Sequence, residues 1–197
     1  MHVNVAMMTS NNALVPDPDK QDDLASKFWQ WPILKVGLRM CSWDDRVVKY
    51  YLLGKPLVYW GSTASLGIFS LLIAWYLIRW QRGYNELTEA DLDHIHFSGL
   101  YPIIGWVLHY LPFVLMARVT YVHHYYPALY FAVLTFGFCV DWLTQKMAAT
   151  SRAVVYALLY VAIIGLFFYF GAIVFGMEGP SNQWAHLNWL KGWRISN

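Results

Sequence analysis

The stretch that decides the fold is 108-LHYLPFVLMARVTYVHHYYPALYF-131. Apolar residues dominate it on both sides of a short polar segment, residues 118–124, which holds Arg118, His123 and His124. An apolar run of about 20 residues can cross a bilayer as a helix, and a connection this short keeps two such helices side by side. The stretch therefore predicts a tight antiparallel hairpin of membrane-spanning helices whose turn is rich in histidine.

The composition of the whole chain indicates a membrane protein. Of its 197 residues, 58% are hydrophobic and only 13% are charged, which lies outside the usual range of soluble domains. The segments apolar enough to span a bilayer are residues 58–78, 100–117, 125–143 and 153–175. The net charge of +2, with no dense cluster of Lys and Arg, argues against nucleic acid as a partner. We expect an all-α polytopic membrane protein with four transmembrane helices.

The two terminal segments are expected to lie at the same end of the molecule, because the number of spans between them is even. Residues 1–57 begin with an alternating, strand-like run and become rich in turn residues and then in tryptophan. They are too few to build a core alone, so we expect a membrane-proximal segment that packs on the bilayer surface or on other protein. Residues 176–197 place tryptophans beside Lys191 and Arg194, which predicts an interfacial amphipathic helix. The start carries no signal peptide, and we expect the chain to belong to a longer product.

A first group of candidate residues lies inside the second span. His109 is near the middle of this span, where an ionisable side chain is costly and is a functional candidate by default. Trp106 and Tyr110 fall on the same helix face at spacings of three and four residues. We expect this face to pack against another part of a larger protein or to line a groove. The alternative is a neutral histidine that is hydrogen-bonded to a neighbouring helix.

A second group of candidates occupies the polar turn and its far end. Arg118 offers a planar fork of donors that suits phosphate oxygens, and His123, His124 and Tyr125 add donors close by. We expect these residues to bind a lipid phosphate or to shape a groove at the membrane surface. The alternative is an arginine that extends to the interface within a belt of aromatic residues.

Metal binding is not expected. His94 and His96 lie beside Asp91 and Asp93, but no cysteine or further histidine completes a closed ligand set. We expect a polar loop at this position and no bound metal. Motifs for a phosphate-binding loop or a nucleophile elbow are also absent from the sequence.

Four stretches of the sequence resemble one family of enzymes. They are SNNALVPDPDKQDDLASKFWQWP from residue 10, GLRMCSWDD from residue 37, YYLLGKPLVYW from residue 50 and GWVLHYLPFVLMARVTYVHHYYPALYF from residue 105. In this order they resemble the C-terminal portion of the protein O-mannosyltransferases.

The resemblance implies an activity, a location and partners. Such enzymes transfer mannose from dolichyl phosphate mannose to Ser or Thr of proteins in the lumen of the endoplasmic reticulum (ER), as multi-pass ER membrane proteins that act as homo- or heterodimers. Their plan is an N-terminal module of the GT-C type, an MIR domain and a closing group of membrane helices, which the four spans resemble. Besides the sugar donor, no cofactor and no metal is implied, and the acceptors are Ser/Thr-rich proteins.

The same resemblance limits what this chain is expected to do alone. The acidic pair of the first luminal loop and the MIR domain have no counterpart in the sequence, so no catalytic residue is assigned and the isolated chain is expected to be inactive. Two other classes stay open. One is a non-catalytic partner subunit of such a transferase, and the other is a small channel or transporter, which the scarcity of ionisable residues in the spans disfavours.

The side of the membrane is the one point where charge and resemblance disagree. The family plan places residues 1–57, the polar turn and the tail in the lumen. The positive-inside rule weakly favours a cytosolic location for the same end, and we follow the family plan. The basic residues near the span ends are Arg46, Lys49, Lys55, Arg118, Lys191 and Arg194 on that side, against Arg79, Arg82, Lys146 and Arg152 on the other.

Overall fold

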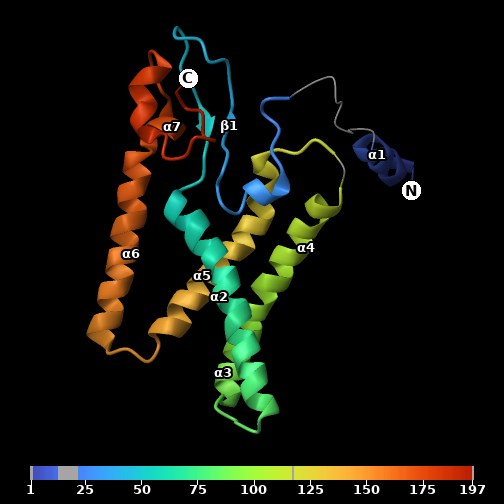
Figure 1. The fold of residues 1–197 in the computed structure, drawn as a ribbon, viewed down its shortest axis with the longest axis vertical. Coiled ribbons are helices and arrows are strands. Elements are labelled where there is room, and N and C mark those ends of the chain that lie inside the picture. The colour runs from blue at the N-terminus through green and yellow to red at the C-terminus, as the bar shows by residue number, and fades with distance from the viewer. Residues whose placement is uncertain (1, 13–21, 117, 197) are drawn as a thin grey trace.

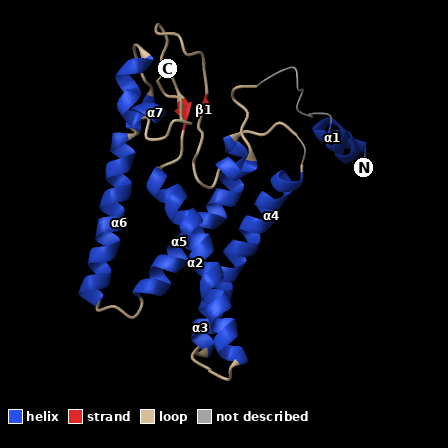
Figure 2. Cartoon of the chain, in the orientation of Figure 1, coloured by secondary structure: helices blue, strands red, loops and turns tan. Residues whose placement is uncertain are grey.

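The computed structural model describes residues 2–12, 22–116 and 118–196, which form long helices below a smaller, irregular end (Figures 1 and 2). Four helical stretches are long and apolar enough to cross a membrane: Pro56–Gln81, Glu89–Leu115, Val122–Thr144 and Ala149–Tyr169. The predicted four-span, mostly helical class is confirmed. The elements are α1 (His2–Asn12), a 3-10 helix (Phe28–Gln30), β1 (Leu38–Arg39), β2 (Tyr51–Leu52), α2 (Pro56–Gln81), α3 (Glu89–His94), a π-helix (Ile95–Leu100), α4 (Tyr101–Leu115), a 3-10 helix (Val122–Tyr125), α5 (Tyr126–Thr144), α6 (Ala149–Tyr169), α7 (Gly171–Phe175) and a 3-10 helix (Ser181–Leu187).

The second spanning stretch begins earlier than the sequence suggested. Thr88 caps α3, because its Oγ1 accepts a hydrogen bond from the backbone N–H of Asp91 (3.2 Å) while the Asp91 carboxylate accepts one from the N–H of Thr88 (3.0 Å). The helix then continues through the π-helix into α4. The predicted polar loop is therefore wrong, and His94 and His96 both lie on helical turns.

Two further expectations are corrected, one about the type of the first element and one about where the fourth span ends. The alternating run at the start forms the helix α1, not a strand, because periodicity alone cannot distinguish the two in a short apolar run. The fourth spanning helix ends at Tyr169 rather than continuing to residue 175, since Phe170 leaves the helical path and α7 follows as a separate short helix.

Helix α5 is the centre of the helical region, with α2 and α4 packed against it (Figure 1). Several buried side chains of α2 and α5 are small, and the thiol of Cys139 lies 3.5 Å from the carbonyl of Ser65. Small side chains let helix backbones approach each other in a membrane, where the hydrophobic effect between helices is weak. On the other side, Gly105 of α4 lies under the ring of Phe131, and a Cβ atom at this glycine would come within 2.4 Å of the ring. The small buried residues are Ser62 and Ser65 of α2 with Ala128, Ala132, Thr135 and Cys139 of α5.

A polar cluster ties α6 to the other helices at the end where the α2–α3 and α5–α6 connections lie. The carboxylate of Asp141 on α5 accepts hydrogen bonds from Arg152 and, at 3.2 Å, from the hydroxyl of Tyr156, both on α6. Nε2 of His94 lies 3.5 Å from the same carboxylate, and its ring stacks on Trp142. No residue of α6 is buried, so the hydrogen bonds of this cluster contribute strongly to the position of α6 relative to α5.

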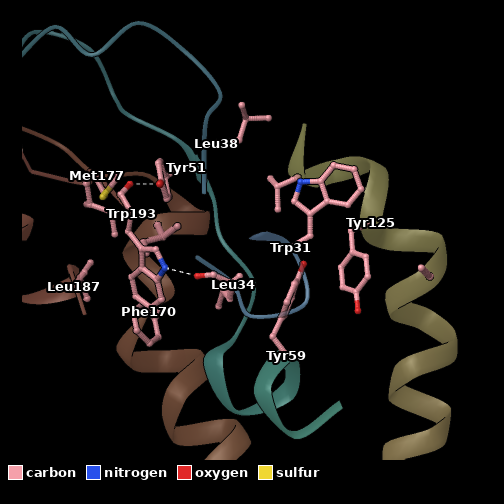
Figure 3. Close-up of a cluster of buried hydrophobic side chains, with 14 residues drawn as sticks. Trp31, Leu34, Leu38, Tyr51, Tyr59, Tyr125, Phe170, Met177, Leu187 and Trp193 are labelled. Atoms are coloured by element: carbon pink, nitrogen blue, oxygen red, sulfur yellow. Dashed lines mark hydrogen bonds between the residues drawn. The ribbon is translucent and has the colours of Figure 1, made fainter. Parts of the chain in front are cut away.

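The opposite end of the molecule forms a cap, which we define as residues 22–55 and 170–196. β1 and β2 pair antiparallel, and Lys49 pairs with Met177 across the two parts of the cap. Residues 22–55 therefore do have a core, which they build together with the tail and the helix ends (Figure 3). We expected this segment to pack on the bilayer surface or on other protein, and this expectation is wrong because the segment packs on the tail and on the helix ends of the same chain.

Trp193 of the tail occupies the middle of the cap. Its side chain is fully buried, its indole N–H donates a hydrogen bond to the carbonyl of Leu34 (2.7 Å), and its own carbonyl accepts one from the hydroxyl of Tyr51 (Figure 3). Leu187 is buried as well, at the end of a 3-10 helix. The predicted amphipathic α-helix in the tail is therefore wrong, because the tail forms a 3-10 helix and turns that direct Leu187 and Trp193 into the cap core.

Replacing Trp193 with alanine is expected to open the cap. A buried tryptophan reduced to alanine costs about 3–5 kcal/mol, and the carbonyl of Leu34 also loses its donor. We expect faster cleavage by trypsin after Lys35 and Arg39 in the purified chain, with helix content by circular dichroism nearly unchanged. Trp189→Ala is the matched control, since this ring is 44% exposed. Equal protease resistance of Trp193→Ala and the wild type would contradict a cap held by its tail.

Candidate functional site

The predicted polar turn lies beside the cap, between α4 and α5. Helix α4 ends at Leu115, where Met116 adopts an extended backbone, and the chain re-enters a helix through the 3-10 helix Val122–Tyr125. Pro127 stands in the first turn of α5, where its missing N–H is not needed. We call residues 118–125 the histidine turn.

The histidine turn is fastened to the first part of the cap. Ser26 and Thr120 exchange two hydrogen bonds, one from the Ser26 N–H to the Thr120 carbonyl (2.8 Å) and one from the Thr120 hydroxyl to the Ser26 carbonyl (2.7 Å). The hydroxyl of Tyr121 donates to the carboxylate of Asp22 (2.6 Å). The indole N–H of Trp31 donates to the hydroxyl of Ser26 (2.9 Å), which places this buried ring under the turn. The turn thus has a defined shape that is set by residues far away in the sequence.

The bond between Tyr121 and Asp22 shifts the pKa of both groups. The phenol hydrogen bond is the main cause that lowers the pKa of Asp22 below its ordinary value of 3.8, and the same bond raises the pKa of Tyr121 above 10.0. The charge of Arg118 acts on the pKa of Tyr121 in the opposite direction.

Three of the four predicted turn residues share one surface. His123 is exposed and stacks on His124 with ring centroids 4.3 Å apart, and His124 in turn stacks on the buried Trp31 at 6.4 Å. Nδ1 of His124 is held by the backbone of Tyr121, at 3.0 Å from its carbonyl and 3.1 Å from its nitrogen. Arg118 is half-buried at the start of the same turn. A guanidinium and two imidazoles are thereby presented together at the edge of the cap.

Tyr125 does not belong to this surface. Its side chain is buried, and its hydroxyl accepts a hydrogen bond from the indole N–H of Trp106 (3.2 Å). Trp106 stacks on Tyr110 with centroids 4.7 Å apart, and the hydroxyl of Tyr110 donates to the carbonyl of Phe28 (3.1 Å). Tyr125 therefore joins the two aromatic candidates of α4 in one cluster, beside Trp31 and Tyr59 (Figure 3).

The expected partner of the aromatic face of α4 is thus corrected. Trp106 and Tyr110 pack against α5 and the first part of the cap, so their contacts are made within this chain. His109 differs from them, because it is exposed, its ring lies against Phe131 of α5 at 5.0 Å, and its Nδ1 donates to the carbonyl of Gly105 (2.8 Å). Of the three candidates on α4, His109 is the one that lies on an outward surface of the helix.

The chemistry available at the histidine turn is binding rather than proton transfer to a reacting group. A guanidinium provides bidentate hydrogen bonds to an oxyanion, and imidazole N–H groups add further donors. Within the ranges that the structure describes, no group of three or more His, Cys, Asp or Glu side chains could hold a metal ion. The sequence did not reveal Trp31, Ser26 and Asp22 as supports of the turn, since these contacts join residues about 90 positions apart and leave no local pattern.

Together, the four spanning helices and the cap with its basic turn define a multi-pass membrane protein. The family model "C-terminal four TMM region of protein-O-mannosyltransferase" matches residues 1–193. The chain belongs to the protein O-mannosyltransferase family, which confirms the resemblance found in the sequence.

Curated relatives and a solved structure agree with this family. Dolichyl-phosphate-mannose--protein mannosyltransferase 2 of Candida albicans is 47% identical over 100% of this chain and 27% of its own length. Dolichyl-phosphate-mannose--protein mannosyltransferase 6 of Saccharomyces cerevisiae is 46% identical over 98% of this chain and 25% of its own length. The chain therefore spans about a quarter of the length of these relatives.

One similar solved structure is described as the structure of the S. cerevisiae protein O-mannosyltransferase Pmt1-Pmt2 complex bound to the sugar donor. It superposes with a TM-score of 0.81 at 29% identity, over 96% of this chain and 26% of that chain. The four helices described here correspond to the C-terminal part of this GT-C fold.

The contact between Tyr121 and Asp22 predicts a pH dependence of stability. Because the pKa of Asp22 is lowered in the folded state, its contribution is present above pH 3.8 and is lost as the pH falls through the folded pKa. Because the pKa of Tyr121 is raised, its contribution is present below pH 10.0 and is lost above it. Tyr121→Phe should lower the thermal midpoint at neutral pH, and the difference between the two proteins should shrink as the pH falls below 3.8 through the lowered pKa of Asp22.

The control for this measurement is Asp23→Asn, which changes the neighbouring carboxylate without touching the bond. It should leave the midpoint close to that of the wild type over the same range. A difference between Tyr121→Phe and the wild type that is independent of pH would contradict the role assigned to the Asp22 carboxylate.

Proposed function

We propose that this chain forms the C-terminal membrane segment of a dolichyl-phosphate-mannose protein O-mannosyltransferase of the ER membrane, with its cap in the lumen. The enzyme would transfer mannose from the lipid-linked donor to Ser or Thr of Ser/Thr-rich acceptor proteins. The family match over residues 1–193 carries this proposal. The names of the relatives support the donor and the reaction type.

Within that reaction, the histidine turn is proposed to bind the phosphate of the lipid donor. Arg118 would provide the planar fork, and His123 would add an exposed donor, while His124 is held by its stacking on Trp31. The leaving group is a dolichyl phosphate, whose negative charge such donors stabilise. The general base that accepts the Ser or Thr proton would be a carboxylate outside this chain, so the chain alone should bind the donor without transferring mannose.

The other proposed residues have supporting roles. Tyr125, Trp106 and Tyr110 would hold the hairpin against the cap and so fix the position of the turn. The exposed His109 is the remaining candidate for a contact with a further module of the transferase or with lipid. No cofactor and no metal is proposed.

The second candidate function is that of a non-catalytic partner subunit of a mannosyltransferase. The similar solved structure is a complex of two different mannosyltransferases, so a homo- or heterodimer is proposed in either case. Co-purification with an active transferase, and loss of that transferase when this chain is deleted, would favour the partner subunit.

Substitutions of Arg118 test the phosphate site. Arg118→Lys keeps the charge but loses the fork, so we expect a moderate fall in crosslinking of the chain to a photoactivatable dolichyl phosphate. Arg118→Ala loses both the charge and the fork, so we expect its crosslinking to fall by about 10-fold. His123→Ala should be milder, because an imidazole offers a single hydrogen bond to the phosphate where the guanidinium offers a two-pronged one. The quantity measured is the crosslinked fraction at equal protein abundance.

The control for these variants is Arg46→Lys, on an exposed part of the cap. It should crosslink like the wild type. If Arg118→Lys equals the wild type and Arg118→Ala only lowers the amount of protein, Arg118 is an interfacial anchor and the phosphate site is wrong.

The native Cys41 tests the proposed luminal side. It is exposed on the cap, whereas Cys139 is buried. In sealed microsomes a membrane-impermeant maleimide should label Cys41 only after the membrane is permeabilised. Gln81→Cys in a Cys41→Ser background, at the end of α2, should show the opposite pattern. Labelling of Cys41 in sealed vesicles would place the cap in the cytosol.

A further inference from the structure

A cavity of about 550 Å³ lies at the end of the helical region opposite the cap. It is enclosed by the last two turns of α2, by the connection to α3 and by the helix that follows. This size is within the range of pockets that hold small molecules. Its lining consists of Ile73, Tyr76, Leu77, Arg79, Trp80, Tyr84, Asn85, Glu86, Leu87, Leu92, Ile95, His96 and Leu100.

The cavity has an apolar part, nearer the middle of the membrane span, and a polar part at the end of the span. On α2 it extends from Ile73 to Trp80, which is about 10 Å along the helix axis. Aliphatic residues line it toward the middle of the span, whereas Arg79 and Glu86 line it where the span ends. Trp80 and Tyr84 stand exposed at its rim, as aromatic residues do at the interface between hydrocarbon and headgroups.

The polar part presents charges of both signs. Arg79 and Glu86 form an ion pair, and the guanidinium also lies over the ring of Tyr84 at 4.3 Å. Nε of Arg79 is buried and has no hydrogen-bond partner among the described residues. The cavity thus combines one donor-rich cation, one carboxylate and several aromatic rings. That set of groups matches a ligand that has a phosphate next to a positively charged amine.

We propose that this cavity binds a zwitterionic glycerophospholipid with a phosphocholine-type headgroup. The phosphate would meet Arg79, the ammonium would lie between Glu86 and the rings of Trp80 and Tyr84, and the upper part of one acyl chain would enter the aliphatic section. A purely anionic lipid fits less well, because Glu86 opposes its headgroup. The site is independent of the donor phosphate proposed at the histidine turn, since it lies at the other end of the spanning helices (Figure 1).

Native mass spectrometry of the purified chain in detergent tests the site, with phosphatidylcholine and phosphatidylglycerol offered at equal concentration. We expect phosphatidylcholine to be retained over phosphatidylglycerol at rising collision energy. Glu86→Gln should abolish the preference for phosphatidylcholine over phosphatidylglycerol, and Arg79→Gln should weaken both by about fivefold, the effect of losing one exposed charge pair.

Two matched controls and one blocking variant complete the experiment. Arg82→Gln and Glu89→Gln change the nearest basic and acidic residues that do not line the cavity, and both should behave as the wild type. Leu92→Trp fills the apolar section without touching the ion pair, so it should lower retention of every phospholipid while helix content stays constant. This variant keeps the test valid if Arg79→Gln or Glu86→Gln disturbs the fold.

Two outcomes would overturn the proposal. The first is equal or stronger retention of phosphatidylglycerol by the wild type. The second is an unchanged lipid preference in Glu86→Gln together with normal retention in Leu92→Trp. Neither outcome bears on the histidine turn, whose test uses other residues and another ligand.

Discussion

The packing of α2 and α4 against α5 is the contact on which the rest of the structure depends. Inside a bilayer, helices gain little from burying apolar surface against each other, so their association relies on close backbone approach and on satisfied polar groups. Here the approach is made by residues such as Ser62 and Ala132, and on the α4 side by Gly105 under Phe131. Because α4 and α5 are held this closely, the histidine turn between them has both of its ends fixed.

The cap supplies the second constraint on that turn. Trp31 lies under His124 and, through Ser26, is linked to Thr120. Two segments about 90 residues apart in the sequence therefore present Arg118 and the two imidazoles from one rigid surface. Rigid support of this kind matters for an anion site, because donors that are already oriented lose less conformational entropy when the ligand binds.

The two ends of the molecule are chemically different. The cap end has a buried core of its own, in which Lys49 is fully buried and donates to the carbonyl of Gly179 (2.6 Å). The other end has the Asp141 cluster and the cavity beside Arg79, both of which lie where the spanning helices meet the interface. No residue of helix α6 is buried, and its hydrogen bonds and ring contacts with other elements lie mainly near its two ends: Asp141 binds Arg152 at one end, and at the other Lys55 lies over Phe167 at 4.2 Å and the hydroxyl of Tyr169 donates to the carbonyl of His186. Long apolar helices with such limited support are suited to contacts with lipid or with other membrane helices.

The sequence by itself determined the four spans, the hairpin and the family, because apolar run length, the prolines at helix starts and the quoted motifs are local properties. It also located Arg118, His123 and His124 on one turn. Only the tertiary structure decided that Tyr125 points inward to Trp106, that His94 lies on a helix beside Asp141, and that the tail buries Trp193. These features depend on contacts between residues far apart in the chain. A side chain's burial and hydrogen-bond partners follow from such contacts, and no local pattern of residues specifies them.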